Sequence, residues 1–256
     1  MTTGIPVAGS GLARHRQTLP LSEVFGPTFQ GEGPFTGYRA RFVRLGGCNL
    51  SCGTGDAPMV CDTEYTWNAA KFDLAVECPE IRTSTILERA GRISAPISVL
   101  TGGEPMTHQR KPAFTALLTG LRELGQVHVE TNGTIPPTPA VGELVDHFTV
   151  SPKLANTGDP AGRRLKPRAL AAFAAAAPGR AVFKFVAASP TDLTEVDRLV
   201  SEYSIPRRAV WIMPEGRTAA RVLACHRSLA DAILTRGYNT TTRLHMLLWP
   251  EEDRGR

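Results

Sequence analysis

The feature that most constrains the fold of this chain is an alternation between short, mostly apolar runs and longer segments with helical start signals. Six runs of three to six residues have the apolar character of strands buried in a sheet. They span residues 40–45, 97–100, 127–129, 148–150, 181–186 and 209–212. Strands that alternate with helices predict a parallel sheet joined by right-handed crossover connections.

Five segments between or after these runs are predicted to be helices, because several begin with proline or with a Ser or Thr cap. They span residues 83–93, 112–124, 167–177, 190–203 and 217–236. No shift in composition suggests a linker. Residues 20–250 are therefore interpreted as one domain, after a flexible leader at 1–19 and before a short tail at 251–256.

Composition excludes several classes of protein. No stretch approaches the roughly 18 consecutive apolar residues that a membrane span needs, and the N-terminus lacks the layout of a signal peptide. A cytoplasmic protein without a membrane partner is therefore expected. The formal net charge is +5, but no basic block with interleaved aromatic residues concentrates it, so nucleic acid is not an expected partner either.

Gly-rich or polar clusters follow almost every predicted strand. In chain order they read GGCNLSC, TGGEP, ETNGT, SPK, VAAS and MPEG. The carboxyl ends of parallel strands meet at one edge of a sheet, and active sites of α/β barrels assemble at that edge. The predicted fold class is therefore α/β, a partial, TIM-like β/α barrel of about six parallel strands with its active site at the strand ends.

Three of the five cysteines, Cys48, Cys52 and Cys61, lie within fourteen positions in the pattern C-x3-C-x8-C. An odd number of cysteines without a signal peptide argues against a disulfide framework and favours a metal or catalytic site. Structural zinc sites usually need four ligands, and no second cysteine pair exists here. Three thiolates instead suit a four-iron cluster with one iron left open; unrelated buried thiols are the alternative.

The segment around these cysteines resembles the cysteine loop of radical S-adenosylmethionine enzymes, whose usual spacing is C-x3-C-x2-C. More narrowly, the chain resembles the 7-carboxy-7-deazaguanine synthase family. The resemblance is carried, in order, by FQGEGPFTG (29–37), FVRLGGCNLSC (42–52), CDTEYTW (61–67), TGGEP (101–105), ETNGT (130–134), SPK (151–153) and LHMLLWP (244–250). The combination of FQGEG with a cysteine cluster that ends in CDT is specific to this family.

The resemblance implies a radical S-adenosylmethionine core with a 4Fe-4S cluster held by Cys48, Cys52 and Cys61. One departure is the segment GTGDAPMV between Cys52 and Cys61, six residues longer than the usual spacing leaves. Cys61 still precedes Asp-Thr, as the family's third ligand does. Cys78 is the alternative ligand, although the adjacent Pro79 and the lack of a motif favour a packing role.

The open iron of such a cluster would bind the amino and carboxylate groups of S-adenosylmethionine. The resemblance implies that Glu104 receives the amino group and that Glu130 or Asn132 contacts the ribose. Two glycines would let backbone approach the cofactor, and two polar residues would lie beside it. The full set predicted for S-adenosylmethionine is Gly102, Gly103, Glu104, Glu130, Asn132, Ser151 and Lys153.

The family's substrate is 6-carboxy-5,6,7,8-tetrahydropterin, and the implied product is 7-carboxy-7-deazaguanine, formed with loss of ammonia on the way to queuosine-type 7-deazapurines. An amide and a carboxylate complement the guanidine-like edge of a pterin, and arginine suits its carboxylate. The residues predicted to bind substrate are Gln30, Gly31, Glu32, Arg44, Thr101 and His245. Thr63 matches the position where the family places Mg²⁺.

Two departures affect the C-terminal substrate contacts: Met246 stands where a lysine is common, and the chain continues six residues past Pro250. Partners implied by the resemblance are a flavodoxin- or ferredoxin-type electron donor and a second copy in a homodimer. Two alternatives remain open from the residues alone. One is another small radical enzyme, such as a glycyl-radical-activating enzyme, and the other is a zinc-stabilised nucleic-acid module.

Overall fold

The sheet of this protein has nine strands in the order β3-β1-β2-β4-β5-β6-β7-β8-β9, in a computed structural model that describes residues 17–54, 57–177 and 179–250. The strands are β1 (Thr18–Phe29), β2 (Arg39–Leu45), β3 (Glu80–Arg82), β4 (Ile97–Gly102), β5 (Gln126–Thr131), β6 (His147–Val150), β7 (Ala181–Ala187), β8 (Val210–Pro214) and β9 (Asn239–Thr240). From β2 to β9 the neighbouring strands are parallel, while β1 is antiparallel to both β2 and β3.

All six predicted strands are present, as β2, β4, β5, β6, β7 and β8. The two-residue strand β9 extends the parallel part of the described sheet to seven strands. Strand β1 was not predicted, and it begins at Thr18, inside the segment interpreted as a leader. Leu19 of this strand is completely buried. Residues 1–16 of that leader and the predicted tail 251–256 lie outside the described residues.

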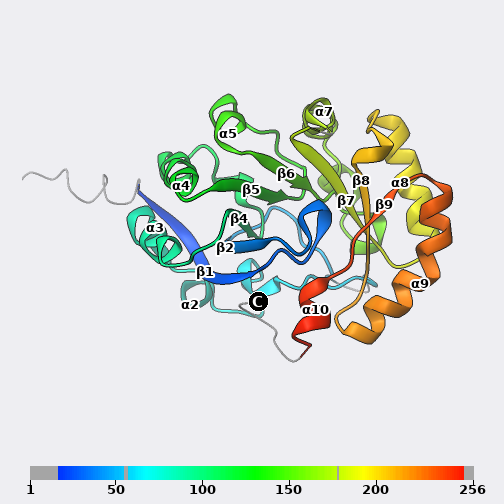
Figure 1. The fold of residues 1–256 in the computed structure, drawn as a ribbon, viewed down its shortest axis with the longest axis horizontal. Helices are drawn as coiled ribbons and strands as arrows, with labels where there is room; N and C mark the ends of the chain where they lie inside the picture. Colours follow the sequence, from blue (N-terminus) through cyan, green and yellow to red (C-terminus); the bar gives the residue numbers. More distant parts are fainter. Residues whose placement is uncertain (1–16, 55–56, 178, 251–256) are drawn as a thin grey trace, which may run out of the picture.

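The five predicted helices are confirmed to within a few residues, and they cover the outer, convex face of the sheet (Figure 1). They are α3 (Thr83–Gly91), α4 (Pro112–Glu123), α7 (Pro167–Ala176), α8 (Pro190–Glu202) and α9 (Ala219–Thr235). Helix α8 begins with a capping box, in which Ser189 and Asp192 each satisfy a backbone N–H of the other. Shorter helices are α2 (Leu74–Glu77), α5 (Pro139–Leu144), α6 (Ala161–Arg164) and α10 (Leu244–Leu248).

Alternation along each strand separates the core from the inner, concave face of the sheet. In β7, Phe183 and Phe185 are fully buried in the main core, which the outer helices share. Lys184 stands between them in the sequence and points to the inner face, because successive side chains of a strand alternate. The same alternation in β5 sends Val129 outward and Glu130 inward. The inner face is therefore where polar side chains gather.

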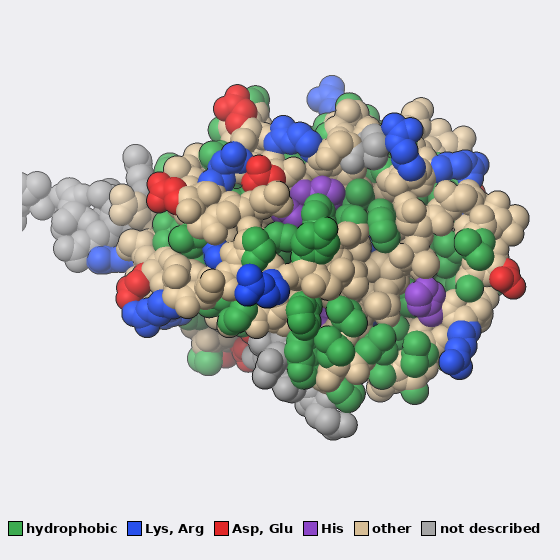
Figure 2. Space-filling model, viewed as in Figure 1, with side chains coloured by type: hydrophobic (Ala, Val, Ile, Leu, Met, Phe, Trp, Pro, Cys, Tyr) green, Lys and Arg blue, Asp and Glu red, His purple; other side chains and the backbone are tan. Residues whose placement is uncertain are grey.

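The open side of the sheet is bridged by chain segments that are far apart in the sequence. The backbone N–H of Gly33, just after β1, donates to Thr241 Oγ1 at 2.8 Å, and Leu244 N–H donates to Gly31 O at 2.9 Å. Phe29 stacks on Trp249 with ring centroids 6.2 Å apart. Figure 2 shows apolar side chains gathered over the region where α10 and the end of β1 lie.

These contacts bring FQGEG and LHMLLWP together at the rim of the partial barrel. Within the described residues, no helix is long and apolar enough to cross a membrane. The α/β fold with an open, mostly parallel sheet agrees with the predicted partial barrel.

Candidate active site

A cavity of about 470 Å³ lies on the inner face, at the carboxyl ends of the parallel strands. All but one of the residues predicted to bind cluster, cofactor, magnesium or substrate line this cavity. They are Gln30, Gly31, Glu32, Arg44, Cys48, Cys52, Cys61, Thr63, Thr101, Gly102, Gly103, Glu130, Asn132, Ser151, Lys153 and His245. The strand-end clusters therefore meet at one site, as the topology of parallel strands requires.

The three clustered cysteines face the cavity as free thiols. Burial raises the pKa of Cys48 to about 12 and that of Cys52 to about 11, so without a bound metal both are protonated at neutral pH. A metal that replaces these protons removes the cost of burying a thiolate. Cys61 Sγ accepts a hydrogen bond from Trp67 Nε1 at 3.4 Å and lies 3.6 Å from Thr63 Oγ1.

No group of three or more His, Cys, Asp or Glu side chains in the described part of the chain converges on a single point as a ready site for one metal ion. A four-iron cluster does not need such convergence, because each thiolate binds a different iron. The donor set of three soft thiolates around one cavity therefore fits an iron–sulfur cluster better than a mononuclear site.

The long cysteine loop is fixed by the segment that follows β6. Gly53 N–H donates to Thr157 O at 2.9 Å, and Met59 N–H donates to Asn156 O at 3.2 Å. The Ser51 N–H donates to Asp159 Oδ2 at 3.0 Å. These contacts anchor the loop on both sides of residues 55–56, which lie outside the described residues, so its extra length is compatible with a defined position for Cys52 and Cys61.

Cys78 occupies a different place from the clustered cysteines. It is buried, does not line the cavity, and packs against Gly46, where an added Cβ would meet the Cys78 Sγ at 2.7 Å. Its thiol lies 3.9 Å from Thr66 O. These contacts support the packing role that the sequence favoured for Cys78.

The two glycines of TGGEP allow the ends of β2 and β4 to lie against each other. An added Cβ on Gly102 would lie 2.0 Å from Leu45 O, and one on Gly103 would lie 2.2 Å from Gly47 O. Gly102 also has a φ of +141°, which side-chain-bearing residues rarely adopt. The close approach that requires glycine here is between two backbone segments, a reason that the sequence alone did not reveal.

Glu104 is the one predicted site residue that does not line the cavity. Its buried carboxylate accepts hydrogen bonds from the Met106 N–H at 2.9 Å, from Thr131 Oγ1 at 2.8 Å and from the Asn132 N–H. Burial raises the pKa of this carboxyl. These donors hold the end of β5 against the turn after β4. The role of Glu104 toward the cofactor's amino group stays a prediction.

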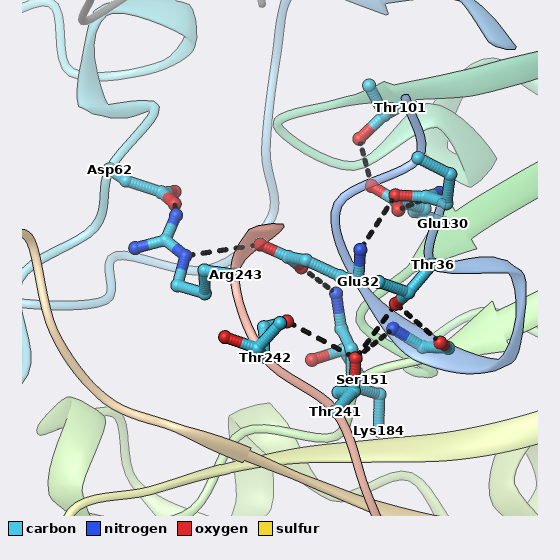
Figure 3. A network of polar contacts seen from close by, with 12 residues as sticks. Glu32, Thr36, Asp62, Thr101, Glu130, Ser151, Lys184, Thr241, Thr242 and Arg243 are labelled. Atoms are coloured by element: carbon cyan, nitrogen blue, oxygen red, sulfur yellow. Dashed lines mark hydrogen bonds and ion pairs between the residues drawn. The ribbon is translucent and has the colours of Figure 1, made fainter. Parts of the chain in front are cut away.

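Glu130 links two residues predicted to bind substrate. One carboxylate oxygen accepts from Gln30 Nε2 at 3.1 Å, and the other accepts from Thr101 Oγ1 at 2.8 Å. Gln30 Oε1 in turn accepts from the Glu32 N–H at 3.1 Å. Asn132, the other ribose candidate, donates to Asn49 Oδ1 at 2.9 Å. Glu130 is therefore tied to the substrate-side residues, as Figure 3 shows for its contact with Thr101.

Arg44 lies beside a carboxylate from the neighbouring strand. Its Nε donates to Glu23 Oε1 at 2.7 Å, and its guanidinium lies 5.6 Å from the ring centroid of Phe25. Tyr65 Oη donates to the same Glu23 oxygen at 3.1 Å. Within the described residues the Nε contact is the guanidinium's only hydrogen bond to the protein, so its terminal nitrogens keep donors for an anionic ligand.

Glu32 forms the centre of a charged network (Figure 3). One carboxylate oxygen pairs with Lys184 Nζ, and the other lies 3.2 Å from Arg243 Nε. Arg243 also pairs with Asp62 and donates to Gly216 O at 2.8 Å. Around the cavity, the network therefore joins the segment after β1, strand β7, the cysteine loop and the C-terminal segment, residues 241–250.

His245 packs against the backbone of FQGEG. An added Cβ on Gly31 would lie 2.3 Å from His245 Nδ1, so only glycine leaves room for this ring. Burial lowers the pKa of His245, which keeps the ring neutral at pH 7. Ser151 and Lys153 contact each other, with Lys153 Nζ donating to Ser151 Oγ at 3.2 Å.

Sequence reasoning missed Lys184 and Arg243 as cavity residues, and it included Asp62 only as part of the CDTEYTW motif. A signal for Lys184 was present, because a lysine inside the apolar strand AVFKFVA is costly to bury without a partner. Arg243 gave no such signal, since it follows three threonines in a polar segment.

Comparison with known proteins finds 7-carboxy-7-deazaguanine synthases that are similar to this chain over nearly its full length. The 7-carboxy-7-deazaguanine synthase of Pyrobaculum aerophilum is 38% identical over 228 residues, 89% of this chain and 93% of the relative. The synthase of Hyperthermus butylicus is 38% identical over 237 residues, 90% of this chain and 92% of the relative. That of Halobacterium salinarum is 34% identical over 254 residues, 90% of each chain.

The crystal structure of QueE from Escherichia coli has the same fold, with a TM-score of 0.65, 24% sequence identity and coverage of 93% of this chain and 100% of that chain. No protein-family model matches the chain. The identity and coverage of the curated relatives nevertheless decide between the resemblance and its alternatives, a glycyl-radical-activating enzyme and a zinc module. This chain belongs to the 7-carboxy-7-deazaguanine synthase family.

Proposed function

We propose that this protein converts 6-carboxy-5,6,7,8-tetrahydropterin to 7-carboxy-7-deazaguanine with loss of ammonia. The observation that carries the proposal is that one cavity gathers the three clustered thiols and the first four residues of FQGEG, Phe29 to Glu32. The names of the curated relatives support the same reaction. A cavity of about 470 Å³ has the size of a small-molecule site.

Cys48, Cys52 and Cys61 would hold a 4Fe-4S cluster, and the loops after β4, β5 and β6 would hold S-adenosylmethionine beside it. When bound, the two groups together supply a carbon-centred radical that can remove a hydrogen atom from a substrate. The protein's part is to bind, orient and exclude water. Trp67 supports this assignment, because its indole N–H donates to Cys61 Sγ, and hydrogen bonds to cluster sulfurs tune reduction potentials.

The substrate's two ends require different partners. The guanidine-like edge of a pterin presents N–H donors. An ionised carboxylate such as Glu32 can accept hydrogen bonds from them in addition to forming its ion pairs. The substrate carboxylate requires a cation, and the terminal nitrogens of Arg44 can donate to it in a bidentate pair. Both residues line the cavity.

Thr63 would take part in binding Mg²⁺ only together with the substrate. Its hydroxyl lines the cavity, but a single hydroxyl gives one of the six oxygen ligands that Mg²⁺ prefers. The remaining oxygens would come from the substrate carboxylate and water. Chelation of magnesium is expected to lower kcat/KM of the loaded enzyme by about tenfold or more, with restoration on adding the ion back.

An electron donor and a second protein copy complete the proposal. A flavodoxin- or ferredoxin-type protein would supply the electron. A homodimer would use apolar surface, and Phe29 and Leu248 are exposed large apolar residues near the stacked Trp249. Light scattering of the purified protein would test the dimer, which predicts twice the mass of the 27.6 kDa chain.

Product formation tests the proposal. Anaerobically reconstituted and reduced protein is incubated with S-adenosylmethionine and 6-carboxy-5,6,7,8-tetrahydropterin, and the products are analysed by mass. We expect 7-carboxy-7-deazaguanine only when both compounds are present. Protein that carries about four irons and an effective reductant but forms no deazaguanine would overturn the proposal. Zinc in place of iron would favour a structural metal instead.

A further inference from the structure

Lys184 is a buried cation in the middle of an apolar strand. Its residue is 5% exposed, and β7 places it between the core residues Phe183 and Phe185. A lysine is almost never buried to this extent without a partner, because the ammonium loses its hydration. Its partner is Glu32, 152 positions earlier in the sequence, which it contacts across the cavity (Figure 3).

Arg243 completes a clamp on the same carboxylate. Lys184 pairs with Glu32 Oε2, and Arg243 Nε lies 3.2 Å from the other oxygen, Oε1. Each carboxylate oxygen therefore has its own cation. Arg243 is itself held by Asp62 and by Gly216 O. Two fixed cations on two oxygens determine both the position of the carboxylate and the rotation of its plane.

The groups around Glu32 come from three elements. Lys184 faces it from β7, Arg243 and His245 face it from the C-terminal segment, and Asp62 faces it from the cysteine loop. Burial by itself would raise the pKa of Glu32, but the charges of Lys184 and Arg243 more than offset it and hold the pKa well below its usual range. Asp62 acts in the opposite direction, as a like charge.

We propose that Lys184 is a positioning residue that keeps Glu32 ionised and oriented to accept the N–H donors of the substrate's guanidine-like edge. The inference rests on the proposed function, because that function assigns Glu32 to the substrate. Lys184 acts through Glu32 and does not contact the reacting atoms. Among the described residues Lys184 forms an ion pair with Glu32 alone, and the Glu130 carboxylate acts on it at longer range. Arg243, by contrast, is paired with both Glu32 and Asp62.

The pH dependence of KM for the carboxypterin tests this role. In the wild-type enzyme Glu32 stays ionised, so its contribution to KM is constant between about pH 8 and about pH 6. In Lys184→Met the carboxyl retains the burial penalty but loses its nearer cation, so it takes up a proton as the pH falls. We expect KM to rise about tenfold or more toward the acidic end, with kcat changed much less.

Three further variants separate charge from packing. Lys184→Arg keeps the charge and is expected to restore a flat KM profile. In Glu32→Gln, adding Lys184→Met should introduce no further pH dependence, because the amide does not titrate. Lys111→Met removes an exposed lysine 3.9 Å from Glu80 and serves as the matched control. A flat KM profile in Lys184→Met while the wild-type enzyme forms product would overturn the inference and leave the proposed function intact.

Infrared difference spectra measure the protonation of Glu32 without any substrate. In Lys184→Met a protonated-carboxyl band is expected to appear as the pH falls from about 8 to about 5. The other carboxyls, including the buried Glu104, give the same background signal in all three proteins, so only this additional band should be absent from the wild-type protein and from Glu32→Gln/Lys184→Met. If the wild-type protein forms no deazaguanine but the three proteins give the expected spectra, the proposed function is rejected. The role of Lys184 in keeping Glu32 ionised is then still supported. Identical spectra in all three proteins would reject that role.

Discussion

Cys61 has the most informative environment of any single residue in the cavity. It lies at the end of the extended cysteine loop, accepts a hydrogen bond from Trp67 and borders Thr63. Cys78, the alternative ligand, lies outside the cavity and packs against the backbone at Gly46. The two cysteines therefore offer a matched pair of substitutions.

Substitution of Cys61 by Ala is expected to abolish the cluster, because three thiolates are the minimum for a cluster with one open iron. Cys78→Ala should keep about four irons per chain and lose only packing, about 1 kcal/mol of unfolding free energy. Iron content and electron paramagnetic resonance of the reduced proteins measure both. A full iron–sulfur cluster in Cys61→Ala, together with loss of the cluster from Cys78→Ala, would show that the ligand assignment is wrong.

Arg44 tests the substrate side at the same scale. Arg44→Ala removes the terminal N–H donors assigned to the substrate carboxylate, so KM is expected to rise about tenfold or more. Formation of 5′-deoxyadenosine without substrate should continue, because the cluster loop is unaffected. Arg92→Ala, which removes an exposed arginine paired with Glu88 in α3, is the control. Loss of iron from Arg44→Ala would contradict the assignment.

At the scale of elements, the adjoining ends of β2 and β4 fix the edge on which the cavity is built. Gly103 N–H donates to Leu45 O at 3.2 Å, and Glu104 N–H donates to Gly47 O at 2.8 Å. These bonds link the cysteine loop to the TGGEP loop through backbone alone. The two loops can approach so closely only because glycines stand at the contact.

Gly102→Ala is therefore expected to lower the free energy of unfolding by about 3 kcal/mol or more, from the 2.0 Å contact with Leu45 O and the positive φ. Gly142→Ala is the matched control, since an added Cβ there meets nothing within 4 Å. Its expected change is under about 1 kcal/mol, in the stabilising direction. Urea titrations of both proteins make the comparison, and equal stabilities would contradict the packing described for β2 and β4.

A second element-scale feature is a histidine pair on β5 and β6. His128 lies opposite His147 in the ladder, their ring centroids are 5.3 Å apart, and Phe35 packs on both rings. Sequence spacing gave no sign of this pair. Burial lowers the pKa of each ring to about 4, so both are neutral in the folded protein at pH 7.

The unfolded chain takes up protons on these rings below about pH 6.5, whereas the folded protein does so only near pH 4. Stability is therefore lost as the pH falls through this window, by about 2 kcal/mol per ring between pH 7 and pH 5. Urea titrations at both pH values should show the drop, and His147→Phe should reduce it. An equal drop in the variant would contradict the buried, neutral state of His147.

Strand β1 shows why part of the fold escaped prediction. Its sequence TLPLSEVFGPTF contains two prolines and a glycine, which are typical of loops. The strand tolerates them because its pairing with β2 is irregular between Phe25 and Thr28, and because it pairs with only three residues of β3. By contrast, the parallel strands were predictable, since burial on both faces makes them continuous apolar runs.

At the scale of the whole molecule, the cavity is bounded where the segment after β1 meets the segment that leads into α10. Gly31 contacts Leu244, and Glu32 contacts Arg243, over more than 200 positions of sequence. The cavity residues that lie in short contiguous motifs, such as FQGEG and TGGEP, could be predicted because each motif is read from neighbouring positions in the sequence. They could not predict that Lys184 and Arg243 clamp Glu32, because this depends on how the sheet curls and on which face each strand presents.

The most direct test follows the hydrogen atom at carbon 6 of the substrate, the carbon that carries the carboxylate, from which we expect the 5′-deoxyadenosyl radical to remove hydrogen. Reduced, reconstituted enzyme is given 6-carboxy-5,6,7,8-tetrahydropterin with deuterium at carbon 6, and the 5′-deoxyadenosyl groups and the product are analysed by mass. We expect 7-carboxy-7-deazaguanine to form and deuterium to enter the 5′-deoxyadenosyl group. Deazaguanine formed without any such transfer, or no deazaguanine from protein with an intact cluster, would contradict this expectation.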